Sequence, residues 1–194
     1  MILRRRMMGG ETWDYEWDYT KGLLSNNGWS KATSGTASEY MTSNSCALKS
    51  PNSGYIRINN PSSFNKTSGV LEVVFSCSGF APTGGKQNFR FCFSNGTNGI
   101  QVCAWNNKGL CLMDADSEAS ITALTSPLSA NTDYLLRLIL RENVGEVWLD
   151  GVCLTNNVNI STILYATNTS LWSQNANNNI THIKSVKLKL GRVF

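Results

Sequence analysis

Asp133-Tyr-Leu-Leu-Arg-Leu-Ile-Leu-Arg141 is followed, after a turn through Asn143 and Gly145, by Glu146-Val-Trp-Leu-Asp-Gly-Val-Cys-Leu154. These residues form three apolar runs, and Asp150-Gly151 separates the last two. Asp-Gly between apolar runs is the strongest short-range signal of a β-hairpin, because both central residues of a type I′ turn need a positive φ. The stretch therefore predicts three consecutive antiparallel strands, an arrangement typical of a β-sandwich.

Short alternating or apolar runs also occur through the rest of the chain. Residues 13–19, Trp-Asp-Tyr-Glu-Trp-Asp-Tyr, alternate strictly and predict a first strand with aromatic rings on one face and Asp14, Glu16 and Asp18 on the other. No segment carries a sustained helical period. We expect further strands, separated by Asn, Gly, Ser and Pro clusters, at residues 40–49, 55–59, 70–76, 88–94, 100–105, 110–113, 134–141, 146–149, 152–154 and 180–190.

The length and charge of the chain limit its class. Its 194 residues suit one all-β domain, which we place at residues 11–194 after a basic arm at residues 1–10 that carries Arg4, Arg5 and Arg6. All 13 acidic residues lie between Glu11 and Asp150, and an extensive basic patch is absent, so we expect no nucleic-acid partner. The opening residues lack the apolar core of a signal peptide, and no apolar run approaches a membrane span. We expect a soluble protein without a membrane partner.

The six cysteines at positions 46, 77, 92, 103, 111 and 153 include no Cys-x-x-Cys pair, and the chain has one histidine, so a zinc site is not expected. Most of them lie in strand-like runs, where a thiol behaves as a small buried hydrophobe. We predict reduced core cysteines. A disulfide between Cys92 and Cys103 across a hairpin is the alternative.

The strand pattern over residues 12–192, together with Val147-Trp-Leu-Asp-Gly151, resembles the concanavalin A-like and laminin-G-like jelly rolls. The resemblance implies an all-β, antiparallel two-sheet sandwich whose first and last strands lie side by side. The acidic stripe of residues 14–18 would then meet Lys187 and Lys189, and such cross-strand pairs contribute roughly 0.2–1 kcal/mol each. The opening ten residues also look like the starts of small phage and prophage proteins from gut Firmicutes.

The sequence gives little support for an enzymatic function. Glycosidases occur on this architecture, and carboxylates two apart on a strand, about 6.7 Å at Cα, meet the spacing that glycoside hydrolysis needs. The rings of residues 13–17 would, however, face away from these carboxylates, and the Glu-x-Asp-x-x-Glu strand of family-16 glycosidases is missing. His182 has no nucleophile motif around it, and phosphate-binding loops are absent. We expect no enzyme, with a glycoside hydrolase as the distant alternative.

Two groups of residues are candidate binding sites. Asp114, Asp116 and Glu118 alternate after a strand in a way that calcium could use, and laminin-G-like domains often bind calcium, although an ordinary acidic loop is the alternative. Glycan binding needs aromatic faces with amides or charges beside them. The candidates are Trp29, Trp105, Asn106, Asn107, Arg137, Trp148 and Trp172, where Arg137 and Trp148 are expected to share one face of neighbouring strands.

Two functions follow from these residues and from the resemblance. The first is a non-catalytic adhesion module that binds a surface glycan and is anchored on a virion, beside other virion proteins, by its basic arm. The second is a purely structural virion protein, a capsid decoration or fibre subunit, that binds no sugar. Adhesion predicts exposed, neighbouring rings at Trp29, Trp105 and Trp172, whereas a structural role predicts buried ones. Sandwich edges also make a homo-oligomer a possible arrangement.

Overall fold

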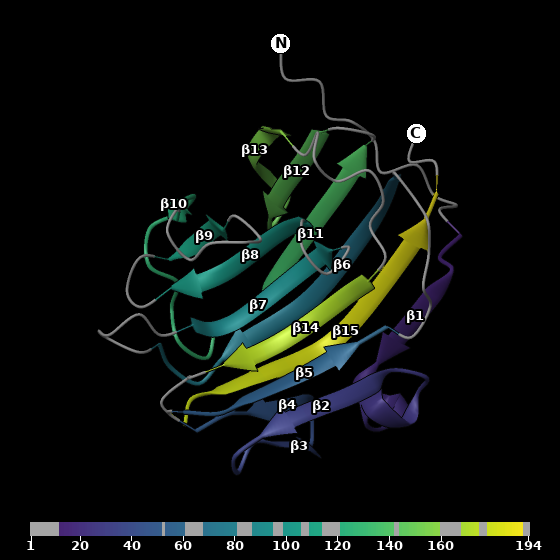
Figure 1. Ribbon diagram of the computed structural model, residues 1–194, viewed down its shortest axis with the longest axis vertical. Helices are drawn as coiled ribbons and strands as arrows, with labels where there is room; N and C mark the ends of the chain where they lie inside the picture. The colour runs from purple at the N-terminus through teal and green to yellow at the C-terminus, as the bar shows by residue number, and fades with distance from the viewer. Residues whose placement is uncertain are drawn as a thin grey trace.

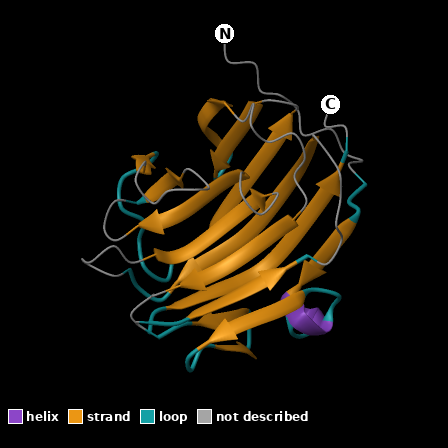
Figure 2. Cartoon of the chain, in the orientation of Figure 1, coloured by secondary structure: helices purple, strands orange, loops and turns teal. Residues whose placement is uncertain are grey.

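The computed structural model describes residues 12–51, 53–60, 68–80, 87–94, 99–105, 109–113, 121–141, 144–159, 168–174 and 178–191. Two antiparallel sheets face each other, with the seven-stranded sheet in front of the eight-stranded one in Figure 1. Figure 2 shows how little of the described chain is helical. The helical part is two short 3₁₀ turns, η1 (Tyr19–Lys21) and η2 (Leu24–Asn26). The fold class predicted from the sequence, an antiparallel two-sheet sandwich, is confirmed.

The eight-stranded sheet, sheet A, runs in the order β13-β12-β11-β6-β15-β4-β3, and β1 pairs with β15 beside this path. Because β15 is long, one half of it pairs with β4 and the other half with β1. Its strands are β1 (Tyr15–Asp18), β3 (Ser38–Met41), β4 (Cys46–Lys49), β6 (Ser68–Cys77), β11 (Tyr134–Arg141), β12 (Val144–Leu149), β13 (Val152–Asn159) and β15 (Ile180–Leu190).

The seven-stranded sheet, sheet B, runs in the order β10-β9-β8-β7-β14-β5-β2. Strand β14, late in the chain, lies in its middle between β7 and β5. The strands are β2 (Ser30–Ser34), β5 (Tyr55–Asn59), β7 (Gln87–Ser94), β8 (Gly99–Trp105), β9 (Leu110–Met113), β10 (Ile121–Ala123) and β14 (Asn168–Gln174).

Most of the predicted strands are confirmed, and the exceptions have physical causes. The run at residues 40–49 is a hairpin of β3 and β4, because Thr42 and Ser45 close a turn in which the Thr42 N–H donates to the Ser45 carbonyl over 2.9 Å. Strands β2, β10 and β14 were not predicted. Their sequences are short or polar, so the alternation of apolar residues that marks a half-buried strand is weak in them.

The turn at Asp150-Gly151 has the predicted conformation, with φ of 49° at Asp150 and 79° at Gly151. The Asp150 carboxylate also accepts a hydrogen bond from the Leu135 N–H over 2.8 Å. Both central residues have the positive φ of a type I′ turn. The decisive hairpin signal is therefore confirmed.

The first and last strands lie side by side, as the resemblance implies. In their register Tyr15 faces Leu188, Glu16 faces Lys187 and Trp17 faces Val186. The strand begins only at Tyr15, however, and Trp13 before it lies with its ring centroid 5.6 Å from the Lys187 Nζ. The alternation of residues 13–19 thus places only Tyr15 and Trp17 within the strand, and Tyr19 begins η1.

Aromatic side chains from both sheets form the centre of the core. Phe75 of sheet A lies 4.5 Å from Phe89 and 5.1 Å from Phe91 of sheet B, measured between ring centroids. All three are fully buried. The two sheets pack against each other through this cluster. This packing holds each sheet in place and so fixes the side chains on its outer face. No helix in the described part of the chain has the length and the apolar composition to cross a membrane.

Five of the six cysteines are buried, as predicted, and Cys153 is exposed. Burial raises the pKa of the Cys46 and Cys77 thiols to about 12, so both are unreactive at neutral pH. The expected pairing across a hairpin is wrong in its register: Cys92 faces Gln101, whereas Cys103 faces Cys111.

Candidate functional site

A row of directly paired residues crosses six neighbouring strands of sheet B. We call it the sheet B row. Each member is the register partner of the next, so all of them point to the same side of the sheet. In order from β2 to β9 they are Ala32, Arg57, Trp172, Arg90, Cys103 and Cys111.

The alternation of each strand directs this row away from the core. On β14, Leu171 is buried in the core and Trp172 is half-buried on the outer face. On β5 the fully buried Ile56 and Ile58 flank Arg57. On β7 the buried Phe89 and Phe91 flank Arg90 in the same way. The core residues therefore fix the direction of the outer side chains, because successive residues of a strand face opposite sides.

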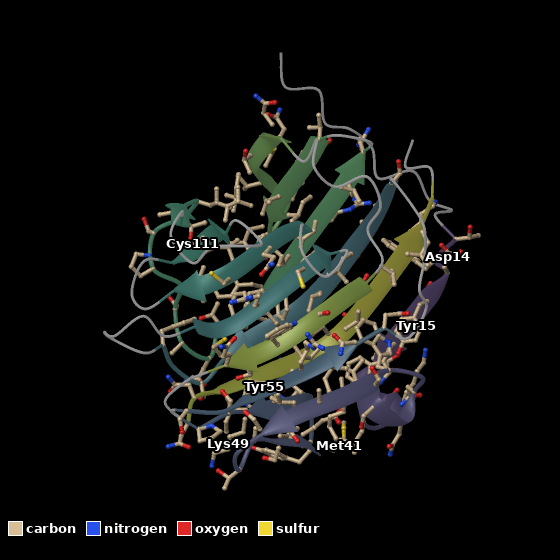
Figure 3. The ribbon with its side chains drawn as sticks, viewed as in Figure 1. Asp14, Tyr15, Met41, Lys49, Tyr55 and Cys111 are labelled. Carbon is tan, nitrogen blue, oxygen red and sulfur yellow. The ribbon has the colours of Figure 1, made fainter. Side chains whose placement is uncertain are left out.

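The Trp172 ring lies between two guanidinium groups. The Cζ atom of Arg57 is 4.8 Å from the ring centroid, and that of Arg90 is 5.0 Å from it. Since β5 and β7 border β14 on opposite sides, the two arginines reach the ring from opposite directions. Tyr55, labelled in Figure 3, adds a second ring at a centroid distance of 6.1 Å. Guanidinium groups at such distances are attracted to the negative face of an indole.

Three buried polar atoms in this region have no hydrogen-bond partner within the described part of the chain. They are Nε1 of Trp172, Nε of Arg57 and Oε1 of Gln174. Gln174 follows Trp172 by two residues on β14 and so shares its face. A buried polar atom without a partner costs about 1–3 kcal/mol, and such atoms commonly mark functional places. Nearby, the Ser170 hydroxyl donates to Asn59 Oδ1 over 2.7 Å and is satisfied.

The electrostatics of sheet B are one-sided. None of its seven strands contains Asp or Glu, whereas they carry Lys31, Arg57 and Arg90. Lys31 reaches across to Glu39 of sheet A, with Nζ 3.6 Å from Oε2. Burial raises the pKa of the Cys92 thiol, while the positive charges of Arg90 and Arg57 act in the opposite direction. The field of the two arginines therefore extends along the outer face.

The outer face of sheet A carries a different row, which we call the sheet A row. Its register partners, in order from β12 to β1, are Trp148, Arg137, Glu72, Lys187 and Glu16. Arg137 Nε lies 3.5 Å from Glu72 Oε2. Trp148 Nε1 donates to Glu146 Oε2 over 2.9 Å. The predicted pairing of Arg137 with Trp148 is confirmed, but both lie on the opposite side of the sandwich from Trp172.

The other predicted glycan-binding residues lie in different places. Trp29 is 3% exposed and packs on Tyr15, with 5.4 Å between ring centroids, so it belongs to the core and is removed from the candidate site. The Trp105 side chain, Asn106 and Asn107 lie outside the described residues. The structure thus brings only Trp172, among the predicted tryptophans, to the outer face of sheet B within the part that it describes.

The calcium candidates Asp114, Asp116 and Glu118 and the arm residues Arg4, Arg5 and Arg6 also lie outside the described residues. Among the side chains that the structure describes, no group of three or more His, Cys, Asp or Glu is placed to hold a metal ion. Calcium binding therefore stays a prediction.

Two carboxylates of the acidic stripe at residues 14–18 accept hydrogen bonds from backbone N–H groups. Asp14 Oδ2 accepts a hydrogen bond from the Leu190 N–H over 2.6 Å and so extends the pairing of β1 with β15. Asp18 caps η1 by accepting from the side chain and the backbone of Thr20, and these hydrogen bonds lower its pKa. Both carboxylates are thus engaged in local structure.

One contact resembles a nucleophile with its base. The Ser45 hydroxyl lies 2.9 Å from His182 Nδ1, and the Thr42 hydroxyl lies 2.7 Å from the Ser45 hydroxyl. Ser45 is fully buried, which keeps a substrate from its oxygen. Partial burial, assisted by the charge of Lys184, lowers the pKa of His182 and favours the neutral ring. The contact therefore ties the β3–β4 turn to β15.

Sequence reasoning did not find Arg57, Arg90, Tyr55 or Gln174. A signal for the arginines exists, since Arg57 lies in Ile-Arg-Ile and Arg90 in Phe-Arg-Phe, each a single charge between core residues. Such a charge must point outward. What the sequence did not show is that β14 lies between these two strands and supplies the ring that they share.

The architecture is that of lectin-like jelly-roll domains. No protein-family model matches the sequence, and no curated protein sequence is similar to it. Many solved structures share the fold, and three of them illustrate the range. A sialidase matches with a TM-score of 0.71 and 10% identity over 91% of this chain, which spans only 18% of the sialidase chain. The metal-free carbohydrate recognition domain of Emp46p matches with a TM-score of 0.63 and 13% identity, and the match covers 86% of this chain and 90% of that domain. The carbohydrate binding module CBM66 from Bacillus subtilis matches with a TM-score of 0.56 and 15% identity, and the match covers 84% of this chain and 95% of that module.

Proposed function

We propose that the protein is a non-catalytic glycan-binding module that presents the outer face of sheet B to a surface glycan. One observation carries the proposal: Trp172 lies between Arg57 and Arg90, and one buried polar atom each of Trp172, Arg57 and Gln174 lacks a hydrogen-bond partner in the described chain. A saccharide offers both hydroxyl donors and oxygen acceptors to such atoms. The carbohydrate recognition domain of Emp46p and CBM66, which share the fold, support this class of function.

Binding without hydrolysis agrees better with the distribution of carboxylates. Most glycoside hydrolases place two carboxylates on either side of the scissile bond. The seven strands of sheet B supply none. On sheet A, Asp14 and Asp18 are committed to hydrogen bonds with Leu190 and Thr20. The described strands of sheet B therefore supply groups suited to hold a sugar and none of the carboxylates that would cleave it.

The setting that we propose is adhesion from a virion. In this scheme the basic arm of residues 1–10, with Arg4, Arg5 and Arg6, contacts other virion proteins and leaves the sandwich free for the glycan. Calcium at Asp114, Asp116 and Glu118 is an addition to the same scheme.

A structural virion subunit is the second candidate, and one observation favours it. Val152 on the edge strand β13 is 61% exposed, and Val144 on the adjoining β12 is 38% exposed. Exposed apolar residues on an unpaired sheet edge are suited to a contact between subunits. In that case the edge of sheet A, and not the face of sheet B, would carry the function.

A glycan array probed with the purified full-length chain tests the proposal. Wild-type protein should bind a defined set of glycans, and Trp172→Ala should reduce that binding at least about tenfold, because the ring holds both arginines. Trp13→Ala is the matched control, since it removes an indole that contacts a cation, Lys187, on the other sheet. An array without specific binding by the wild type would contradict the proposal and favour the structural subunit.

A further inference from the structure

We infer that the ligand of the sheet B row is an anionic saccharide, which Arg57 and Arg90 recognise through its carboxylate or sulfate group. The inference deepens the proposed function and rests on it. It concerns the chemical class of the glycan, on which the fold itself is silent.

The arrangement around Trp172 argues against recognition of a neutral sugar by stacking. Stacking needs an exposed aromatic face. Here guanidinium groups lie 4.8 Å and 5.0 Å from the ring centroid, and they come from the strands on either side of β14. The indole is therefore engaged by cations from both sides. Its part is to position the two guanidinium groups on the outer face of sheet B.

Among the residues that the structure describes, no carboxylate forms an ion pair with Arg57. Its register partners are Ala32 and Trp172, and no strand of sheet B contains an acidic residue. Arg137 and Arg141 on sheet A behave differently, since they lie 3.5 Å from Glu72 and 3.2 Å from Glu146. A guanidinium without a carboxylate partner is suited to bind one from a ligand, because its planar set of donors matches the two oxygens of a carboxylate or sulfate.

The unpartnered atoms indicate both an acid and a hydroxyl. Nε of Arg57 and Nε1 of Trp172 are donors and need an acceptor, whereas Oε1 of Gln174 is an acceptor and needs a donor. A sugar that carries an acidic group offers oxygen acceptors and hydroxyl donors in one ring. Arg57 and Gln174 are both half-buried, so part of each residue reaches the surface on this face.

The long-range electrostatics agree with this chemistry. The positive charges of Arg90 and Arg57 lower the pKa of Cys92, against the larger opposite effect of burial. Cys92 lies on the same face, opposite Ser170 of β14. The two charges thus act together over this part of the face, where they would attract an anion.

Affinity electrophoresis of the full-length chain tests the inference. Native gels are cast with pectate, with dextran sulfate or with neutral dextran, and retention is compared with that in a plain gel. We expect retention in an anionic gel that weakens as salt is added, and a loss of at least about tenfold for Arg57→Gln. The matched control is Arg141→Gln, which removes an arginine from sheet A that is already paired with Glu146 and should leave retention unchanged.

The gels also separate the sources of the anion. Retention by pectate alone assigns a carboxylate, and retention by dextran sulfate alone assigns a sulfate. Arg57→Lys keeps the charge but loses the planar fork, so we expect it to fold as the wild type does and to show intermediate retention. It serves as the second variant if Arg57→Gln does not fold by circular dichroism.

Three results would overturn the inference, and they differ in what else they affect. Equal affinity for neutral dextran and for the anionic gels, or neutral hits on the glycan array that depend on Trp172 but not on Arg57, would leave the glycan-binding proposal standing and remove the anion. Equal retention in a gel containing single-stranded DNA would indicate a general polyanion surface. Absence of retention and of array hits would remove both proposals together.

Discussion

The two outer faces of the sandwich differ in how they distribute charge. The sheet A row alternates basic and acidic residues across neighbouring strands, from Arg137 through Glu72 and Lys187 to Glu16. The sheet B row contains Arg57 and Arg90 on either side of Trp172, with no acid in any of its strands. In the described strands, acidic and basic residues alternate on sheet A, whereas sheet B carries basic residues and no acid.

This difference shows how one fold separates stability from recognition. Opposite charges paired across strands contribute roughly 0.2–1 kcal/mol each, and they leave little net field for a ligand. On sheet B the register partner shared by the two arginines is an aromatic ring, Trp172. The ring positions the guanidinium groups, and the attraction of a cation to a ring leaves the cation's charge in place.

The largest effect on stability should come from an ion pair that joins the two sheets, Lys31 with Glu39. The Glu39 side chain is fully buried, accepts from the Ser25 N–H over 3.1 Å and lies 3.6 Å from Lys31 Nζ. Glu39→Ala should lower the free energy of unfolding by about 2–3 kcal/mol, somewhat below the usual cost of breaking a buried pair because Lys31 is part-exposed. Urea unfolding followed by circular dichroism measures it.

Glu39→Gln is the control for this prediction, since it keeps an acceptor for Ser25 and loses only the charge. It should cost less than the alanine variant. If neither variant lowered the free energy of unfolding measurably, the stability of the sandwich would not depend on the pair of Lys31 with Glu39.

A smaller effect should distinguish the two rows by their response to salt. Glu72→Gln leaves Arg137 without its carboxylate and should lower the free energy of unfolding by about 0.5–1 kcal/mol at low salt, and by less at high salt, where exposed charges are screened. Arg57→Gln loses a contact with a ring instead, about 0.5–1 kcal/mol for a part-exposed cation. We expect that loss to change little with salt. Thermal unfolding at two salt concentrations compares the variants, and an identical salt response would remove the distinction between the rows.

The smallest effect concerns pH and His182. Its pKa is lowered in the folded state by partial burial and by Lys184, so the unfolded chain binds a proton more readily. Its contribution to stability is therefore present above the unfolded pKa, about 6.5, and is lost as the pH falls through the lower folded pKa. The melting temperature should decrease slightly from pH 7.5 to about pH 5.5, and His182→Gln should reduce that dependence. A dependence that is unchanged in the variant would assign it to other groups.

Much of the fold could be predicted because its signals are local. The Asp150-Gly151 turn and the alternating residues of β15 act through positive φ and through a period of two, both of which are visible in a few neighbouring residues. Strand β14 escaped prediction for the converse reason. Only Leu171 and Trp172 in it are large apolar residues, and its place in the sheet depends on pairing with β5 and β7, far away in the sequence.

The candidate site was predicted only in part, and tryptophan shows why. Trp29 and Trp172 both lie near Asn-rich stretches, and the sequence treats them alike. In the structure Trp29 packs on Tyr15 in the core, while Trp172 stands between two arginines on the outer face. A tryptophan is suited to both places, so its type does not decide between them. The neighbours supplied by distant strands decide.

The sequence by itself determined that this protein is an antiparallel sandwich, that Asp150 and Gly151 form a tight turn, and that Arg57 and Arg90 point away from the core, because each of these follows from residues within a few positions of one another. Only the tertiary structure decided that the two arginines share one ring, and that the acids within the described strands lie on the other sheet. The physical reason is register. Which residues face each other across strands is set by how the whole chain packs its core, and this pairing places charge where a ligand can meet it.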